Sequence, residues 1–168
     1  MQRRQVVMGL ALMPLAACGG RGRVGADGLP VQTVYEITPE VAAQIPFRML
    51  DGVNALRSAA GRTPLTLDAR LNAAAETHSL DMARQNRPWH FGSDGSSPLD
   101  RLRRVGFTGP LVGETIAESY ETELQTLAAW MERPETREVI MDPAARLMGL
   151  AWYQEPAGKL WWTMVLAA

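Results

Sequence analysis

The chain contains only two histidines, His78 and His90, and a single cysteine, Cys18. Imidazole titrates nearest to neutral pH, so each histidine is a candidate proton donor, proton acceptor or metal ligand. His90 stands in the segment RPWHFGSDGSSPLDR, residues 87–101, whose Gly, Ser, Asp and Pro residues indicate successive turns. Because loops on a rigid scaffold often carry functional side chains, we predict that His90 belongs to a site. The alternative is a surface histidine with no role.

Glu114 is a second candidate for chemistry, in the segment VGETIAES. It follows Gly113 and lies two residues before the β-branched Ile116. We expect a half-buried carboxyl group, whose pKa would rise unless a partner stabilises the charge. The alternative is an acid at the start of a helix, where the helix dipole favours negative charge.

The segment around His78 has the period of an amphipathic helix. Asp68 is placed to cap its first turn and Asn86 to end it. One face of this helix carries Leu71, Ala74, Ala75, His78 and Met82. We therefore interpret His78 as a core histidine with one hydrogen bond, and a ligand role is the alternative.

The other segments predict an α+β fold. Apolar residues recur from Phe47 to Ala60 with Gly61 at the C-cap position, which predicts a helix after Pro46. A short basic helix is expected at 99–105, another helix within 122–133, and a further turn at 135–141 after a helix-breaking Pro134. Residues 147–154 and 160–168 predict a terminal antiparallel hairpin of largely buried strands.

The N-terminus predicts export. Residues 1–17 combine two arginines with a short apolar run and are interpreted as a signal peptide. The following Cys18 ends a LAAC sequence that resembles the lipobox of bacterial lipoproteins, so we expect lipid attachment there. An ordinary signal peptide that happens to contain a cysteine is the alternative. Residues 18–44 are expected to be a lipidated, flexible tether, and either Sec or twin-arginine export fits the pattern.

Composition and motifs exclude several classes of function. The net charge of −1 and the lack of a basic stripe argue against nucleic acid as a partner. Ser93, Ser96 and Ser97 lack the Gly-x-Ser-x-Gly elbow of a serine hydrolase and are expected to cap helices or form turns. The GSDG sequence lacks the acidic ligands of a calcium loop.

The chain resembles the CAP superfamily of cysteine-rich secretory, antigen 5 and pathogenesis-related 1 proteins. It is most similar to the bacterial, disulfide-free branch of SCP-like domains. The resemblance covers about Phe47 to Ala168 and places the CAP domain at residues 45–168. It is carried by five blocks in family order: VNALRSAAGRTPLTLDARLNAAAETHSLDMA, WHFGSDGSSPLDRLRRVGF, GETIAESY, AAWMERPETREVIMDP and WWTMVLA.

The resemblance implies an α-β-α sandwich with a small antiparallel sheet between helical layers. It also implies a cleft in which His90 matches the family's cleft histidine and Glu114 the glutamate of its GEN motif, here GET. Many members hold a divalent metal such as zinc there. Thr136 stands where bacterial relatives have a second cleft histidine, and a hydroxyl is a poor zinc ligand. We therefore expect neither a metal site nor a cofactor.

The function predicted from these residues is a lipid-anchored binding module of the bacterial cell envelope. Its cleft, with His90, Glu114 and aromatic neighbours such as Trp89, Trp130 or Trp152, would bind a lipid, glycan, cell-wall fragment or protein partner. The alternative is a His/Glu-dependent and metal-assisted hydrolase or peptidase. The chain is expected to face the periplasm, with the outer membrane favoured over the inner because Gly19, and no aspartate, follows Cys18.

Overall fold

One mixed β-sheet is the centre of the folded unit. The computed structural model describes residues 34–119 and 121–168 of the chain. The strands, in the order β1-β3-β4-β2 across the sheet, are β1 (Thr66–Leu67), β3 (Leu147–Gln154), β4 (Leu160–Ala167) and β2 (Leu111–Ser119). β4 is antiparallel to both of its neighbours, whereas the two-residue β1 runs parallel to β3. The expected antiparallel sheet is therefore mixed at the β1 edge.

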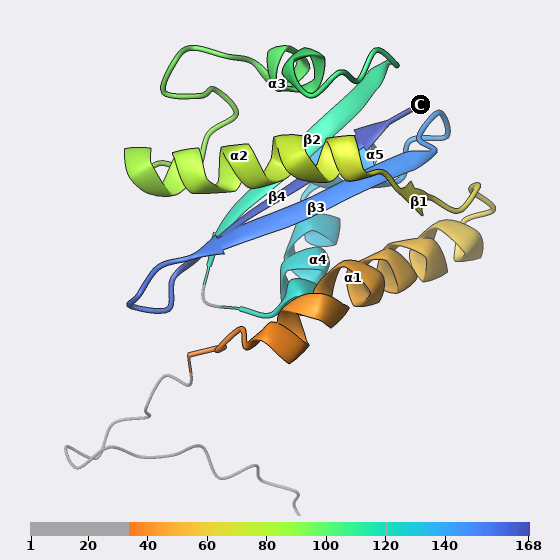
Figure 1. Ribbon diagram of the computed structural model, residues 1–168. Coiled ribbons are helices and arrows are strands. Elements are labelled where there is room, and N and C mark those ends of the chain that lie inside the picture. The colour runs from red at the N-terminus through yellow and green to blue at the C-terminus, as the bar shows by residue number, and fades with distance from the viewer. Residues whose placement is uncertain (1–33, 120) are drawn as a thin grey trace, which may run out of the picture. The chain divides into compact units, whose positions relative to one another are not determined.

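The central strand β4 is buried along its whole length because helices cover both faces of the sheet (Figure 1). Trp162 and Met164 pack into one apolar cluster, while Val165 points into a second cluster on the opposite face. This alternation follows from the two-residue period of a strand. The hairpin of β3 and β4 agrees with the prediction, and the layered arrangement is the expected α-β-α sandwich.

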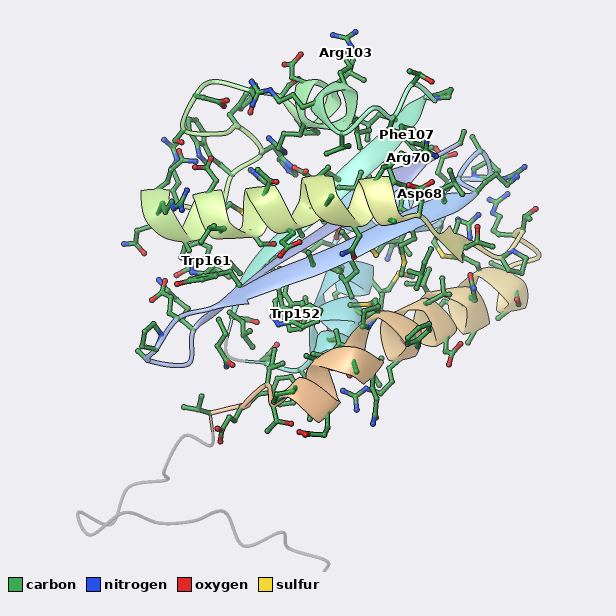
Figure 2. The ribbon with its side chains drawn as sticks, viewed as in Figure 1. Asp68, Arg70, Arg103, Phe107, Trp152 and Trp161 are labelled. Carbon is green, nitrogen blue, oxygen red and sulfur yellow. The ribbon has the colours of Figure 1, made fainter. Side chains whose placement is uncertain are left out.

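Helix α2 (Ala69–Gln85) covers one face of the sheet and matches the predicted element. The Asp68 carboxylate accepts the backbone N–H groups of Arg70 and Leu71, and Asn86 ends the helix in the left-handed conformation with φ 48°. A side chain at position 149 of β3 would collide with the α2 backbone at Leu71, so only glycine allows this close approach. At the start of the helix, Arg70 lies over the ring of Phe107 (Figure 2).

Helix α1 (Pro39–Ala59) begins well before the predicted start at Phe47. Thr38 caps it by accepting the N–H of Val41, and Pro39 occupies the first turn, where its missing N–H costs nothing. Pro46 lies inside the helix instead of preceding it. The buried Ile45 and Met49 lie on either side of this proline, so packing outweighs the lost hydrogen bond.

The segment before α1 is attached to the domain, so the predicted tether does not extend to residue 44. The Gln154 side chain accepts the N–H of Ile37 and donates to the carbonyl of Tyr35. The Tyr35 hydroxyl donates to the buried Glu123 at 2.8 Å. Burial and this hydrogen bond raise the pKa of Tyr35 to about 12. The predicted signal peptide, Cys18 and most of the tether lie outside the described residues.

Two short helices join α1 in the second layer. α4 (Glu123–Glu132) starts at a capping box formed by Thr122 and Gln125, and Pro134 begins α5 (Pro134–Ile140), as the sequence predicted. The short basic helix also exists, as α3 (Pro98–Arg104) beside α2. Among the described helices, none is both long and apolar enough to cross a membrane.

Arg57 joins α1 to the segments that precede β1 and β3. It is fully buried, and its guanidinium donates to the carbonyl oxygens of Thr63, Ile140, Asp142 and Ala145. Three loop carbonyls and the last carbonyl of α5 therefore depend on one side chain.

We expect Arg57→Met to lower the free energy of unfolding by about 3 kcal/mol, because it leaves buried carbonyl groups without a donor. Urea denaturation measures the change. The exposed Arg62 offers a matched control, since Arg62→Met removes the same charge without removing these hydrogen bonds. Equal losses in the two variants would show that the carbonyl contacts do not matter.

Candidate functional site

Glu114 lies in strand β2, between the sheet and the α2 layer. It pairs with Val165 of β4, whose side chain belongs to the cluster under α2, and its own side chain is only 2 % exposed. The alternative of an acid at a helix start is therefore wrong, because this segment is a strand. A buried carboxylate can stay charged only if hydrogen-bonding or charged partners replace its lost hydration.

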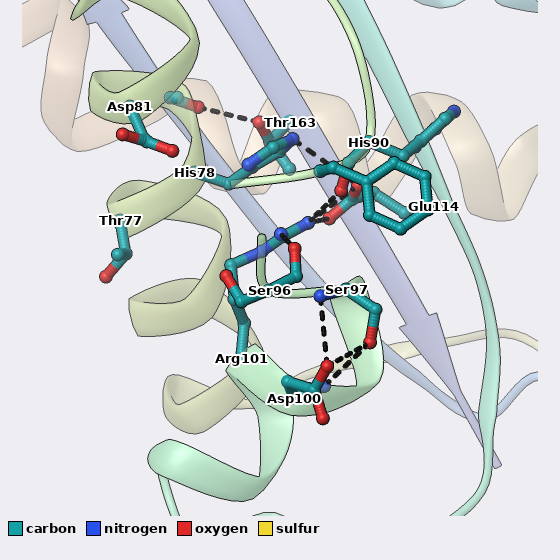
Figure 3. Close-up of polar contacts among 12 residues, drawn as sticks. Thr77, His78, Asp81, His90, Ser96, Ser97, Asp100, Arg101, Glu114 and Thr163 are labelled. Carbon is teal, nitrogen blue, oxygen red and sulfur yellow. Dashed lines mark hydrogen bonds and ion pairs between the residues drawn. The ribbon is translucent and has the colours of Figure 1, made fainter. Parts of the chain in front are cut away.

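The main partner of Glu114 is Arg101, a residue that the sequence reasoning did not single out. Its Nη2 donates to both carboxylate oxygens at 2.9 and 2.7 Å, and its Nη1 donates to the Ser96 carbonyl (Figure 3). The Arg101 side chain is 4 % exposed. Of the three arginines in LDRLRR, only Arg101 is buried, as is the adjacent Leu102. The helical spacing of this segment is the sequence signal that could have indicated an inward-facing arginine.

His90 completes the cluster from the loop between α2 and α3. Its Nδ1 lies 2.9 Å from Glu114 Oε1 and donates to this carboxylate, while its ring is 49 % exposed. This bond fixes the tautomer and leaves Nε2 without a partner among the described residues. His90 therefore connects the buried ion pair of Glu114 and Arg101 with the protein surface. The structure brings together the two residues that the sequence analysis paired.

The loop that carries His90 is held against α2 by several contacts. Asp81 of α2 accepts both the backbone N–H and the hydroxyl of Ser93. Trp89 donates through its indole to Gln85, and its ring is covered by the guanidinium of Arg87 at 3.9 Å. The position of His90 is thus determined by a fixed loop.

The second histidine, His78, is a core residue, as the sequence analysis favoured. It is fully buried, and its Nε2 donates to the Trp89 carbonyl at 2.9 Å. The same nitrogen lies 3.6 Å from Glu114 Oε1 (Figure 3). His78 therefore supports the loop and packs beneath the carboxylate; one hydrogen bond satisfies its donor, and its Nδ1 has no partner among the described residues.

The charges of the cluster are set by burial and by one another. Burial alone would raise the pKa of Glu114, but the hydrogen bond from His90 and the charges of His78 and Arg101 together hold it below its ordinary value. Burial lowers the pKa of His78, the negative charge of Glu114 opposes this effect, and Arg101 lowers the pKa further. At neutral pH the carboxylate is therefore charged and His78 is neutral.

Thr136 and two of the three tryptophans do not join this cluster. The Thr136 hydroxyl donates to the backbone carbonyls of Trp130 and Arg133, at the start of α5. Trp130 is buried in the opposite layer, and its indole donates to the carbonyl of Ile116. Trp152 packs on Trp162 toward α1 (Figure 2). Of the three predicted tryptophans, only Trp89 is a neighbour of His90.

The residues at this site do not fit the zinc ion that many family members hold. Both oxygens of Glu114 are bonded to Arg101, and Nε2 of His78 is committed to a carbonyl. The described parts of the chain hold no group of three His, Cys, Asp or Glu side chains arranged for a metal. Arg101 supplies next to Glu114 the positive charge that a divalent metal would bring.

Comparison with known proteins agrees with this fold. The cysteine-rich secretory protein family, CAP, matches residues 50–166, so the chain belongs to this family. It is 28 % identical over 123 residues to the uncharacterized protein YkwD of Bacillus subtilis. This alignment covers 73 % of this chain and 47 % of YkwD. The chain thus spans about half the length of this curated relative.

Two solved structures share the fold at low sequence identity. An outer surface protein of Borrelia burgdorferi superposes with a TM-score of 0.68 at 15 % identity, covering 74 % of this chain and 92 % of that one. An extracellular protein containing an SCP domain from Bacillus anthracis gives a TM-score of 0.68 at 22 % identity, covering 80 % and 45 %. These similarities establish the CAP fold.

Acid should destabilise the protein through His78. The folded-state pKa of His78 lies below its ordinary value of 6.5, so the unfolded chain takes up the proton first as the pH falls. Stability is therefore full above about pH 6.5 and declines below it, by at most about 1.4 kcal/mol per pH unit for one proton. The lowered pKa of Glu114 adds a further loss below its ordinary value of 4.5.

Urea denaturation between pH 7.5 and pH 5 measures this slope. His78→Gln keeps a donor for the Trp89 carbonyl and cannot be protonated, so its stability should hardly change over that interval. His90→Gln, at the exposed histidine, should retain the slope. A slope that survives in His78→Gln would assign the acid sensitivity to another group.

Proposed function

We propose that this CAP-domain chain is an exported, lipid-anchored binding module of the bacterial cell envelope. Its ligand is a lipid, a glycan, a cell-wall fragment or a protein partner that contacts His90 above Glu114. The observation that carries this proposal is a half-exposed imidazole whose tautomer is fixed by a buried carboxylate. Such a ring offers one oriented Nε2 to a ligand at little entropic cost.

The bonding of Glu114 supports binding over hydrolysis. A catalytic carboxylate must be able to accept or release a proton, but Arg101 and His90 occupy the oxygens of Glu114 and stabilise its charged form. The serines of the nearby loop are engaged in turns and caps: Ser97 caps α3 with Asp100, and Ser93 is bonded to Asp81. The cluster therefore keeps Glu114 charged and keeps the loop that carries His90 in a fixed position.

A hydrolase or peptidase is the second candidate, because a histidine oriented by a carboxylate is also the arrangement of a general base. Turnover of ester or peptide substrates that disappears in His90→Ala, together with stoichiometric zinc in the purified protein, would favour this candidate.

The proposed location is the periplasmic side of the cell envelope, with the outer membrane favoured. It rests on the apolar N-terminal segment, on Cys18 in its LAAC context and on the Gly19 that follows. Two structural relatives, an outer surface protein and an extracellular protein, are consistent with such a location. Acyl chains on Cys18 would then provide the membrane partner.

Cys18→Ser should move the protein from the membrane fraction to the soluble fraction, because it removes the only thiol that can carry an acyl chain. Cell fractionation and mass spectrometry of the N-terminal peptide measure the two effects. Gly20→Ser is a matched control that leaves the thiol in place. A wild-type chain without diacylglyceryl on Cys18 would contradict the anchor.

His90→Ala should abolish co-purification of a bound molecule while the protein stays folded, since the His90 ring is half exposed. The full chain, extracted from the envelope fraction, is analysed by mass spectrometry for compounds that accompany it at stoichiometric levels. Arg103→Gln changes an exposed side chain on α3 and serves as the control (Figure 2). An identical set of compounds in wild type and His90→Ala would overturn the role of His90.

A further inference from the structure

A polar groove runs between α2 and α3, next to the His90 cluster. Its volume is about 400 Å³, within the range of small-molecule sites. One wall is a stripe along α2 that includes Glu76, Asp81 and Arg84. The opposite wall consists of the loop after His90 and of Arg101 and Arg104 from α3. Nearly every lining side chain is polar or charged, so the groove does not suit a lipid.

Most of the charged groups in the groove already have partners within the protein. Asp81 accepts hydrogen bonds from Ser93 and from Gln85. Arg104 pairs with Asp94, whose pKa is held well below its usual range by hydrogen bonds from Ser96 and Arg104. Arg101 is committed to Glu114. Arg101 and Arg104 are thus neutralised by ion pairs, whereas Asp81 keeps its negative charge but has both oxygens occupied by hydrogen bonds.

Glu76 and Arg84 are different. Both are exposed, and neither has an ion-pair partner in the parts of the chain that the structure describes. They are eight residues apart on α2, which separates them by about 12 Å along the helix axis. Apart from Asp81, whose oxygens are occupied, the groove thus offers a carboxylate toward one end and a guanidinium toward the other, each without an ion-pair partner among the described residues.

We infer that this groove binds a short peptide with a free amino group and a free carboxylate. The ammonium group is placed at Glu76 and the carboxylate at Arg84, whose guanidinium suits a planar oxyanion. An extended chain spans about 3.3–3.6 Å per residue, so three or four residues match the separation of the two charges. The lining contains no aromatic ring on which the apolar face of a sugar could stack.

The site is distinct from the contact at His90, and the inference does not depend on the proposed function. Thr77 of α2 lines the groove, and its hydroxyl donates to the carbonyl of Ala73 while its oxygen can still accept a hydrogen bond. Thr77 therefore provides an acceptor for the peptide backbone, which carries a donor and an acceptor at each residue.

Calorimetric titration with trialanine, N-acetyl-trialanine and trialanine amide tests the inference on the full chain. Wild type should bind trialanine with a Kd tighter than about 1 mM. Blocking either end should weaken binding about tenfold, because each block removes one charge-assisted contact.

Two variants assign the ends of the peptide. Arg84→Gln should bind the free acid and the amide equally, and Glu76→Gln should bind the free amine and the N-acetyl form equally. Arg103→Gln and Glu138→Gln change exposed residues outside the groove and should preserve both preferences. His90→Ala should also preserve them, which separates this site from the proposed function.

Three results would overturn the inference: no binding of trialanine at about 10 mM, equal binding of the three peptides by wild type, or end preferences that survive in Arg84→Gln and Glu76→Gln. Because both substituted side chains are exposed, folding of the variants is expected, and circular dichroism checks it.

Discussion

The buried ion pair between Glu114 and Arg101 is the constraint on which the candidate site depends. A carboxylate between a sheet and a helix has lost its water, so it stays charged only if donors surround it. Arg101 supplies two of these hydrogen bonds and His90 a third. Through its other bonds, to the carbonyls of Ser96 and His90, Arg101 also holds the loop that presents the imidazole. The Arg101 side chain thus both stabilises the charge of Glu114 and fixes the position of the His90 loop.

This arrangement gives the cleft of this chain a different chemistry from that of metal-binding family members. A divalent metal and an arginine both neutralise a buried glutamate, but the metal leaves coordination positions open, whereas a guanidinium bonded to both oxygens closes them. With Thr136 hydrogen-bonded to backbone carbonyls, the second ligand position is also lost. What remains accessible is the imidazole of His90, a single oriented group above a fixed negative charge. Recognition therefore suits the site better than metal chemistry.

The α2 helix borders both proposed ligand sites, the His90 cluster and the polar groove. Its inner face approaches the sheet at Gly149 and carries His78 beneath the carboxylate. Its outer face borders the groove, and Asp81 ties the His90 loop to it. Arg101 lies between the two, since it lines the groove and forms the ion pair with Glu114.

The sequence by itself determined the elements whose signals are local. Asp68 and Asn86 bound α2, and the apolar composition of the last two strands was enough to predict that they are largely buried. The pairing of His90 with Glu114 came from a resemblance, and the structure places them in contact. The tertiary structure alone decided the partner of Glu114, the orientation of Thr136 and the passage of α1 through Pro46. Each of these depends on contacts between segments distant in the chain, and such contacts leave no periodic or capping pattern in the sequence.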